Sequence, residues 1–241
     1  MFKLCPTKIL VLIIAWLTVM VLLVVNVLKP FLDGIGLTVG QSFVVALVQL
    51  IFTLVFVTPL WRVIWRWLPQ LNEWVYPDLS GDWDVELKSN FSRIDALLKS
   101  AKGEAPSRDF LAGDESALPP LGVHKMRARI RQSWAIIEME FWDPSGVGPI
   151  KESKTLMVEP FRGSGGRHGL AYIFEQTNET DVVGDDSKFR GAAWIVRDRD
   201  DVNVLSGRMW SDRKWRLGMN TAAELRFTRQ ISSPLSGRRR S

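Results

Sequence analysis

Two long apolar windows occupy the first quarter of the chain, and neither contains a charged residue. The first covers residues 9–28, where Thr18 and Asn26 are the only polar members, and the second covers residues 43–61. Each is 19 or 20 residues long. At about 1.5 Å per residue, a helix of that length crosses a hydrocarbon core of about 30 Å. The pattern therefore predicts a hairpin of two transmembrane helices.

Charges on the flanks of these windows predict the orientation. Lys3 and Lys8 precede the first window, and Arg62 and Arg66 follow the second. Because cytoplasmic flanks carry the excess of Lys and Arg, we expect both termini in the cytoplasm. A cleaved signal peptide explains the first window less well, since its apolar stretch exceeds the usual ~7–15 residues and ends without a small-residue cleavage site.

From Asp82 onward the apolar period changes to two. Trp83, Val85 and Leu87 alternate with charged residues, and seven later segments alternate in the same way: residues 125–131, 135–141, 152–158, 169–176, 189–196, 202–210 and 222–229. Such alternation predicts strands with one buried and one solvent-facing side. Breaks rich in Gly, Pro and Asp separate them. We expect an all-β domain, a small eight-stranded antiparallel β-barrel whose interior is filled by side chains or holds one small ligand.

These patterns divide the chain into four parts. They are a two-helix transmembrane anchor (residues 1–68), an interfacial stalk (69–80), a β-barrel sensor domain (81–231) and a basic disordered tail (232–241). Within the barrel domain, residues 92–122 break the alternation and predict a flexible insertion, in which residues 94–98 favour a helical turn or two.

The exit of the second window is crowded with aromatic residues: Trp61, Trp65, Trp67, Trp74 and Tyr76. Rings with one wet edge favour the headgroup layer, so this cluster predicts an interfacial belt. The alternative is that these rings belong to the core of the soluble domain.

The net charge of +5 is concentrated near the membrane and in the tail. Up to Tyr76 the chain has five Lys or Arg residues and two Asp or Glu residues, which leaves a net charge of +2 for the rest. Three of the remaining cations are Arg238, Arg239 and Arg240. The barrel lacks the broad cationic surface of a nonspecific DNA or RNA binder, so we expect no nucleic-acid polymer as a partner. The tail is expected to be solvated or to touch anionic lipid.

Catalytic and metal-binding motifs are missing from the sequence. His124 and His168 lie far apart and have no cysteine beside them, which argues against a metal site. Glu138 and Glu140 share one strand face, but a solvated outer face explains them better than an acid–base pair does. We expect no enzymatic activity and no cofactor. The single cysteine, Cys5, fits a reducing compartment.

A series of short motifs follows the second window in a fixed order. The first is Pro77-Asp78-Leu79-Ser80-Gly81-Asp82-Trp83, and the later ones are Ile130-x-Gln132-x-Trp134, Ser153-x-Thr155, Tyr172-x-Phe174-x-Gln176, Phe189-Arg190-Gly191, Leu205-x-Gly207 and Ser211-x-Arg213. Together with the topology, they resemble the bacterial antiphage (CBASS) effectors that combine two transmembrane helices with a β-strand-rich domain. The chain departs from that family's pattern at Met209, Ala223 and Gln176, where an aromatic residue, a glycine and an asparagine are expected.

This resemblance implies a multi-pass protein of the bacterial inner membrane whose cytoplasmic barrel binds a 3′,3′-cyclic dinucleotide. Ligand binding would then drive homo-oligomerisation of the membrane helices, disrupt the lipid bilayer and end in abortive infection. Aromatic faces stack bases, Arg forks onto phosphate, and Gln reads a base edge. The candidate ligand-binding residues are Gln132, Trp134, Ser153, Tyr172, Arg213 and Thr221. For Trp134 and Tyr172 the alternative is a place in the barrel core.

Two other functions remain open. A membrane-tethered, lipocalin-like carrier of an apolar ligand requires an apolar lumen without a phosphate partner. A structural subunit requires a barrel that binds another protein. Binding of cyclic dinucleotides distinguishes the three.

Overall fold

The computed structural model describes residues 7–34, 41–107, 118–134, 136–147, 150–179 and 186–230. By its internal contacts the chain divides into two compact units. The helical unit contains Met1–Asp78 and Gln132–Ile136, and the barrel unit contains Leu79–Arg131 and Ile137–Ser241. The predicted tail, residues 232–241, lies outside the described residues.

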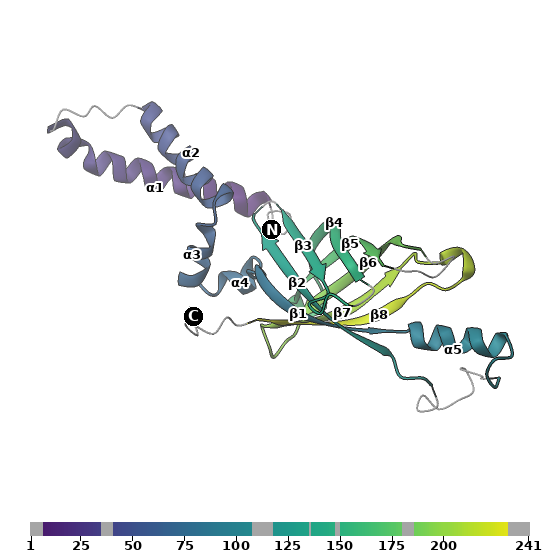
Figure 1. Cartoon of the computed structure of the whole chain (residues 1–241). Helices are drawn as coiled ribbons and strands as arrows, with labels where there is room; N and C mark the ends of the chain where they lie inside the picture. The colour runs from purple at the N-terminus through teal and green to yellow at the C-terminus, as the bar shows by residue number, and fades with distance from the viewer. Residues whose placement is uncertain are drawn as a thin grey trace, which may run out of the picture. The chain divides into compact units, whose positions relative to one another are not determined.

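Two apolar helices begin the helical unit (Figure 1). Helix α1 spans Thr7–Gly34 and helix α2 spans Gln41–Val57. They pack on each other through Val21, Val25 and Val44. Within α1, the 18 residues Ile14–Phe31 are long and apolar enough to cross a membrane.

Helix α2 is shorter than the second predicted span, residues 43–61. Its 17 residues extend over about 26 Å. The chain turns at residues 58–60, and helix α3 (Trp61–Trp67) begins directly afterwards. Pro59 accounts for the break, because proline lacks the backbone N–H and clashes with the preceding helical turn. Among the described helices, α1 alone has the length expected of a span.

The aromatic cluster after α2 is partly internal. Trp61, Trp65 and Tyr76 are buried, whereas Trp67 and Trp74 are 82% and 71% exposed. The indole Nε1 of Trp65 donates a 2.9 Å hydrogen bond to the carbonyl of Tyr76, and the rings of Trp61 and Trp65 meet edge to face at 5.4 Å. The interfacial belt predicted from the sequence is therefore wrong for three of its five rings, which are core residues.

The predicted stalk, residues 69–80, contains one short helix. Helix α3 is followed by the short helix α4, Leu71–Trp74. The chain then extends from Tyr76 towards the first strand, where the Asn72 side-chain oxygen accepts a 3.2 Å hydrogen bond from the backbone N–H of Asp78.

Eight antiparallel strands, each next to its neighbours in the chain, close into a barrel (Figure 1). They are β1 (Gly81–Ser89), β2 (Gly122–Gln132), β3 (Ile137–Trp142), β4 (Ile150–Arg162), β5 (His168–Asn178), β6 (Lys188–Arg197), β7 (Val204–Ser211) and β8 (Ala222–Arg229). The predicted fold class is confirmed, and each strand overlaps the segment expected for it. Pairing of β1 with β8 closes the sheet, so no edge strand is left open.

Side-chain alternation separates a packed interior from a charged outer wall. On β1, Trp83 and Val85 point inward and are buried. On the same strand, Asp82 lies outside and pairs with Arg129 of β2 at 2.7 Å. The Arg129 hydrogen bond lowers the pKa of the Asp82 carboxyl. Exposed pairs of this kind contribute little stability, so burial of the inward row is what holds the barrel together.

Two inward-facing glycines stand where the barrel wall leaves no room for a side chain. A Cβ on Gly207 would lie 1.9 Å from the carbonyl oxygen of Trp194. A Cβ on Gly191 would lie 2.3 Å from the ring of Phe174, which pairs with Gly191 across β5 and β6. The phenyl ring fills the space that the glycine leaves.

The predicted insertion, residues 92–122, contains more regular structure than expected. Helix α5 (Phe91–Ala101) follows β1 almost directly. The Ser92 hydroxyl donates a 2.6 Å hydrogen bond to the carbonyl of Pro120, and this ties the helix to the segment before β2. The helix is longer than the helical turn or two expected at residues 94–98, and residues 108–117 of the predicted insertion lie outside the described residues.

Candidate ligand-binding site

One end of the barrel is closed by a packed layer. Trp83, Leu170 and Phe227 are fully buried there. The Trp83 indole N–H donates a 3.0 Å hydrogen bond to the carbonyl of Leu79, and the Arg229 guanidinium lies 4.5 Å from the Trp83 ring centre. Side chains fill this end.

The middle of the barrel is apolar and nearly filled. The ring of Tyr172 stacks on Phe141 with centroids 5.9 Å apart. The cavity that remains has a volume of about 30 Å³, room for two or so water molecules. Ser153 and Gln176 line it and are paired across β4 and β5. Burial raises the pKa of the Tyr172 phenol, so the hydroxyl stays neutral.

The other end opens into a pocket of about 390 Å³, which we call the barrel mouth. Here β1 ends at Ser89, opposite Gly122 at the start of β2. Its volume lies within the range of roughly 300–1,000 Å³ typical of small-molecule sites. The polar residues that line it are Ser89, His124, Gln176, Asn178, Glu179, Arg213, Lys214 and Thr221.

Arg213 is held at the barrel mouth by two aromatic rings. Its guanidinium carbon lies 5.6 Å from the ring centre of Phe91, the first residue of α5, and 5.6 Å from that of Phe189 on β6. Both distances fall within the ~6 Å reach of a cation–π contact. The guanidinium is planar, and its fork of N–H groups matches the oxygens of a phosphate or carboxylate.

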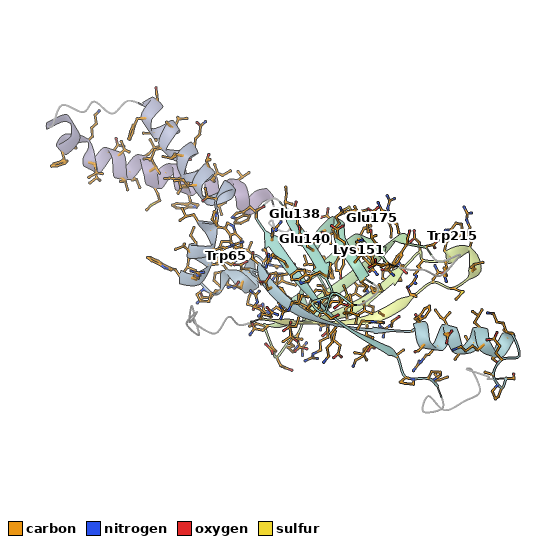
Figure 2. The ribbon with its side chains drawn as sticks, in the orientation of Figure 1. Trp65, Glu138, Glu140, Lys151, Glu175 and Trp215 are labelled. Carbon is orange, nitrogen blue, oxygen red and sulfur yellow. The ribbon has the colours of Figure 1, made fainter. Side chains whose placement is uncertain are left out.

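Hydrogen bonds fix the turn between β7 and β8 that carries Arg213 and, beside it, Trp215 (Figure 2). Asp212 accepts a 2.7 Å hydrogen bond from the backbone N–H of Arg190, and Asp186 accepts one of 2.7 Å from that of Lys214. Both anchors join this turn to the start of β6 and the segment before it. Because the turn is tied down, ordering it on ligand binding costs little entropy.

Four of the six predicted binding residues line the middle cavity or the mouth of the barrel. Ser153 and Tyr172 line the middle cavity, and Arg213 and Thr221 line the mouth. The Thr221 hydroxyl shares a 2.6 Å hydrogen bond with that of Ser211. Gln176 lines both spaces and connects the two groups.

The structure does not place the other two, Gln132 and Trp134, with these four. Both belong to the helical unit. The Gln132 side-chain amide donates a 3.0 Å hydrogen bond to the carbonyl of Pro77, and the backbone carbonyl of Gln132 accepts one of 3.0 Å from the Arg62 guanidinium. The Trp134 ring meets Trp65 edge to face at 5.5 Å. These contacts are those of core residues.

The barrel mouth contains residues that were not predicted from the sequence, among them Asn178, Phe189 and Phe91. Asn178 follows Gln176 by two positions, so strand alternation places both on the inner face. Phe189 belongs to a motif noted in the sequence, but no role was expected of it. Phe91 gives no sequence signal, because only the fold brings the start of α5 to the turn after β7.

The acidic pair on β3 lies on the outside of the barrel. Glu138 and Glu140 follow one another along that strand (Figure 2), and Glu140 pairs with Arg131 at 3.4 Å. In the part of the chain that the structure describes, no group of three or more His, Cys, Asp or Glu side chains is placed to hold a metal ion.

No protein-family model matches this chain, and a search of curated proteins finds no match to it.

Proposed function

We propose that the chain is a membrane-anchored effector of antiphage defence whose barrel mouth binds a cyclic dinucleotide. The observation that carries this proposal is Arg213, held between Phe91 and Phe189 beside a pocket of about 390 Å³. The guanidinium is suited to a phosphate. Aromatic and apolar walls are suited to a base, and each stacked base contributes about 1–3 kcal/mol.

The charges around the barrel mouth favour an anion. Arg213 and Lys214 both line the pocket, and Glu179 is the one acid among the described residues of that lining. A cationic rim of this kind attracts anionic ligands over several ångströms and raises their rate of binding.

The pocket sizes argue against a lipocalin-like carrier of an apolar ligand. The apolar middle of the barrel holds about 30 Å³, whereas an apolar cavity that binds even benzene is of the order of 150 Å³. The larger space is the mouth, where the cations Arg213 and Lys214 stand beside apolar residues. A carrier of an apolar ligand would have no use for these two cations.

In this proposal α1 and α2 both cross the bacterial inner membrane and leave the barrel in the cytoplasm. The length of α2, about 26 Å, falls a little short of a typical hydrocarbon core of about 30 Å. A shorter helix is accommodated by local thinning of the bilayer. Fusions of a cytoplasmic fluorescent reporter at either terminus should fluoresce, and a periplasmic phosphatase fused at the C-terminus should be inactive.

Ligand binding would shift the membrane helices towards self-association. Gln49, Thr53 and Thr58 are polar residues within or just after α2. The Thr53 hydroxyl donates to the carbonyl of Gln49 on its own helix at 2.9 Å, and that of Thr58 donates to Leu54. The Gln49 side chain is exposed, so its amide is the group suited to hydrogen bonds between helices of different copies.

The test is binding of cyclic dinucleotides to the full chain in lipid nanodiscs, measured by calorimetry. Arg213→Ala should weaken binding about ten- to a hundredfold, since a hydrogen bond to a charged group contributes about 1.5–3 kcal/mol. Arg216→Ala is the matched control. Arg216 lies in the same turn, but its guanidinium lies over Trp215 instead of lining the mouth.

The cellular half of the test measures uptake of a membrane-potential dye in bacteria that make the chain and the messenger. Depolarisation should require wild-type Arg213. If the full chain binds no member of a panel of cyclic di- and trinucleotides and the cells stay polarised, the proposed function is wrong.

A further inference from the structure

Strand β5 places two side-chain amides next to each other inside the barrel mouth. Gln176 and Asn178 are 7% and 5% exposed, and both line the pocket. The Gln176 Nε2 donates a 2.8 Å hydrogen bond to the Oδ1 of Asn178. Two buried amides with their polar ends towards a pocket are unusual, because burial of an amide is unfavourable unless its hydrogen bonds are made.

This single bond uses only part of the hydrogen-bonding capacity of the pair. Each amide carries one acceptor oxygen and two donor hydrogens. Within the described residues, the bond between Gln176 and Asn178 is the one hydrogen bond that either side chain makes. The Gln176 Oε1 and the Asn178 Nδ2 therefore have capacity to spare, and they are open to the mouth, where a ligand or water can satisfy them.

We infer that Gln176 and Asn178 form a base-reading pair, which recognises the hydrogen-bonding edge of a nucleobase while Arg213 holds a phosphate. This inference rests on the proposed function and adds a specificity-determining element to it. The pair offers an acceptor and a donor side by side, and amide side chains use this arrangement to bind base edges bidentately. All three residues line the same pocket, so one ligand can meet them together.

The two parts of the site then have separate roles. The contact of Arg213 with a phosphate is the same for every cyclic dinucleotide, so it contributes affinity without selecting a base. The amide pair contributes selection, because a buried donor or acceptor left without a partner disfavours the wrong base. A change in the pair should alter the ratio of affinities for two bases, whereas a change in charge at the rim should alter both affinities alike.

The substitution Asn178→Asp tests this without changing the shape of the side chain. The new carboxylate still accepts the Gln176 hydrogen bond, but it replaces the donor of the pair with a second acceptor. Guanine presents two adjacent donors, N1–H and N2–H, which a carboxylate accepts together, while adenine presents one donor beside an acceptor. The variant should therefore shift the ratio of dissociation constants in favour of cyclic di-GMP over cyclic di-AMP by about tenfold or more.

Lys214→Asn is the matched control. It also lowers the net charge of the barrel mouth by one. Lys214 has a left-handed backbone with φ 52°, which asparagine adopts readily. This variant should weaken the binding of both ligands alike and leave their ratio within about twofold, because repulsion of phosphate does not depend on the base.

Calorimetry with the full chain in nanodiscs gives both dissociation constants for each protein. A ratio that is the same in wild type, Asn178→Asp and Lys214→Asn overturns the base-reading role but leaves the proposed function standing. Absence of binding of either ligand to the wild type overturns both. If Asn178→Asp does not fold, Gln176→Glu is the second variant. The new carboxylate can only accept, so the Asn178 amide turns to donate to it and both ligand-facing atoms of the pair become acceptors. The same shift towards cyclic di-GMP should follow.

Discussion

The guanidinium of Arg213 lies 5.6 Å from the ring centre of Phe189, a residue 24 positions earlier in the chain. The contact joins the turn after β7 to the start of β6 and points the cation at the barrel mouth. Arg213 carries the proposed function, so the ring that positions it has a measurable role of its own.

Replacing that ring should weaken ligand binding without removing any charge. Phe189→Leu keeps an apolar side chain but loses the cation–π contact, which contributes about 0.5–2 kcal/mol. We expect the dissociation constant for a cyclic dinucleotide to rise about three- to tenfold. Trp215→Leu removes an exposed ring from the same turn and should have no effect on binding. Equal effects of the two substitutions would contradict a positioning role for Phe189.

Gly207 should tolerate no side chain. A Cβ there would lie 1.9 Å from the carbonyl oxygen of Trp194, a distance that forces β6 and β7 apart. Gly207→Ala should destabilise the barrel by more than about 3 kcal/mol or prevent folding. At Gly163 the nearest atom would be 3.6 Å away and the backbone is extended, so Gly163→Ala should change the melting temperature by only a degree or two. A soluble, stable Gly207→Ala protein would show that the register of β6 and β7 is different.

Trp134 should act as a core residue of the helical unit. Its ring meets Trp65 edge to face, and such pairs contribute about 0.5–1.5 kcal/mol beyond burial. A double-mutant cycle with Trp65→Leu and Trp134→Leu should therefore give a coupling energy of that size in chemical unfolding of the full chain. Trp134→Leu should leave the ligand dissociation constant within about twofold. A large loss of ligand affinity with no change in the free energy of unfolding would show instead that Trp134 belongs to the binding site.

The amide of Gln49 should matter for assembly and not for ligand binding. Gln49→Leu removes the polar group from an exposed position of α2, and an interhelical hydrogen bond in lipid contributes about 0.6–2 kcal/mol. We expect weaker ligand-induced cross-linking and less depolarisation, with calorimetry unchanged. Leu50→Ala, at the neighbouring exposed position, serves as the control. Full depolarisation by the Gln49→Leu protein would exclude this residue from the interface.

Asp198 should make part of the stability of the barrel depend on pH. Its carboxylate accepts backbone hydrogen bonds from Asp200 and Asp201 at 2.9 and 3.3 Å, and these bonds lower the pKa of Asp198 in the folded protein. A carboxyl with a lowered folded pKa stabilises the fold above its ordinary value, roughly pH 4, and loses this effect as the pH falls through the folded pKa. Asp198→Asn should therefore lower the melting temperature at pH 7, and the difference from wild type should disappear towards pH 2. A difference that stays constant with pH would contradict this assignment.

The alternation of apolar and polar residues in the sequence was enough to predict the strands of the barrel. The inner and outer faces of a strand follow from its own sequence, because side chains point to opposite sides at each step. This is why eight segments could be assigned from the sequence. Helix α1 could be predicted for the same reason, because its length and its lack of charge are properties of a single segment.

The parts that needed the tertiary structure depend on residues far apart in the chain. Trp65 contacts Tyr76 and Trp134, which are distant from it in the chain but belong to the same unit. A run of tryptophans after an apolar helix has the same composition whether the rings are core residues or lie at a membrane interface. The candidate site also has a part that the sequence predicts and a part that only the tertiary structure determines. Strand alternation put Tyr172, Gln176 and Asn178 on one inner face, but their distance from the barrel mouth depends on the register between strands, which the pattern does not encode. Phe91 and Arg213 meet only because closure of β1 on β8 brings the start of α5 to the turn after β7.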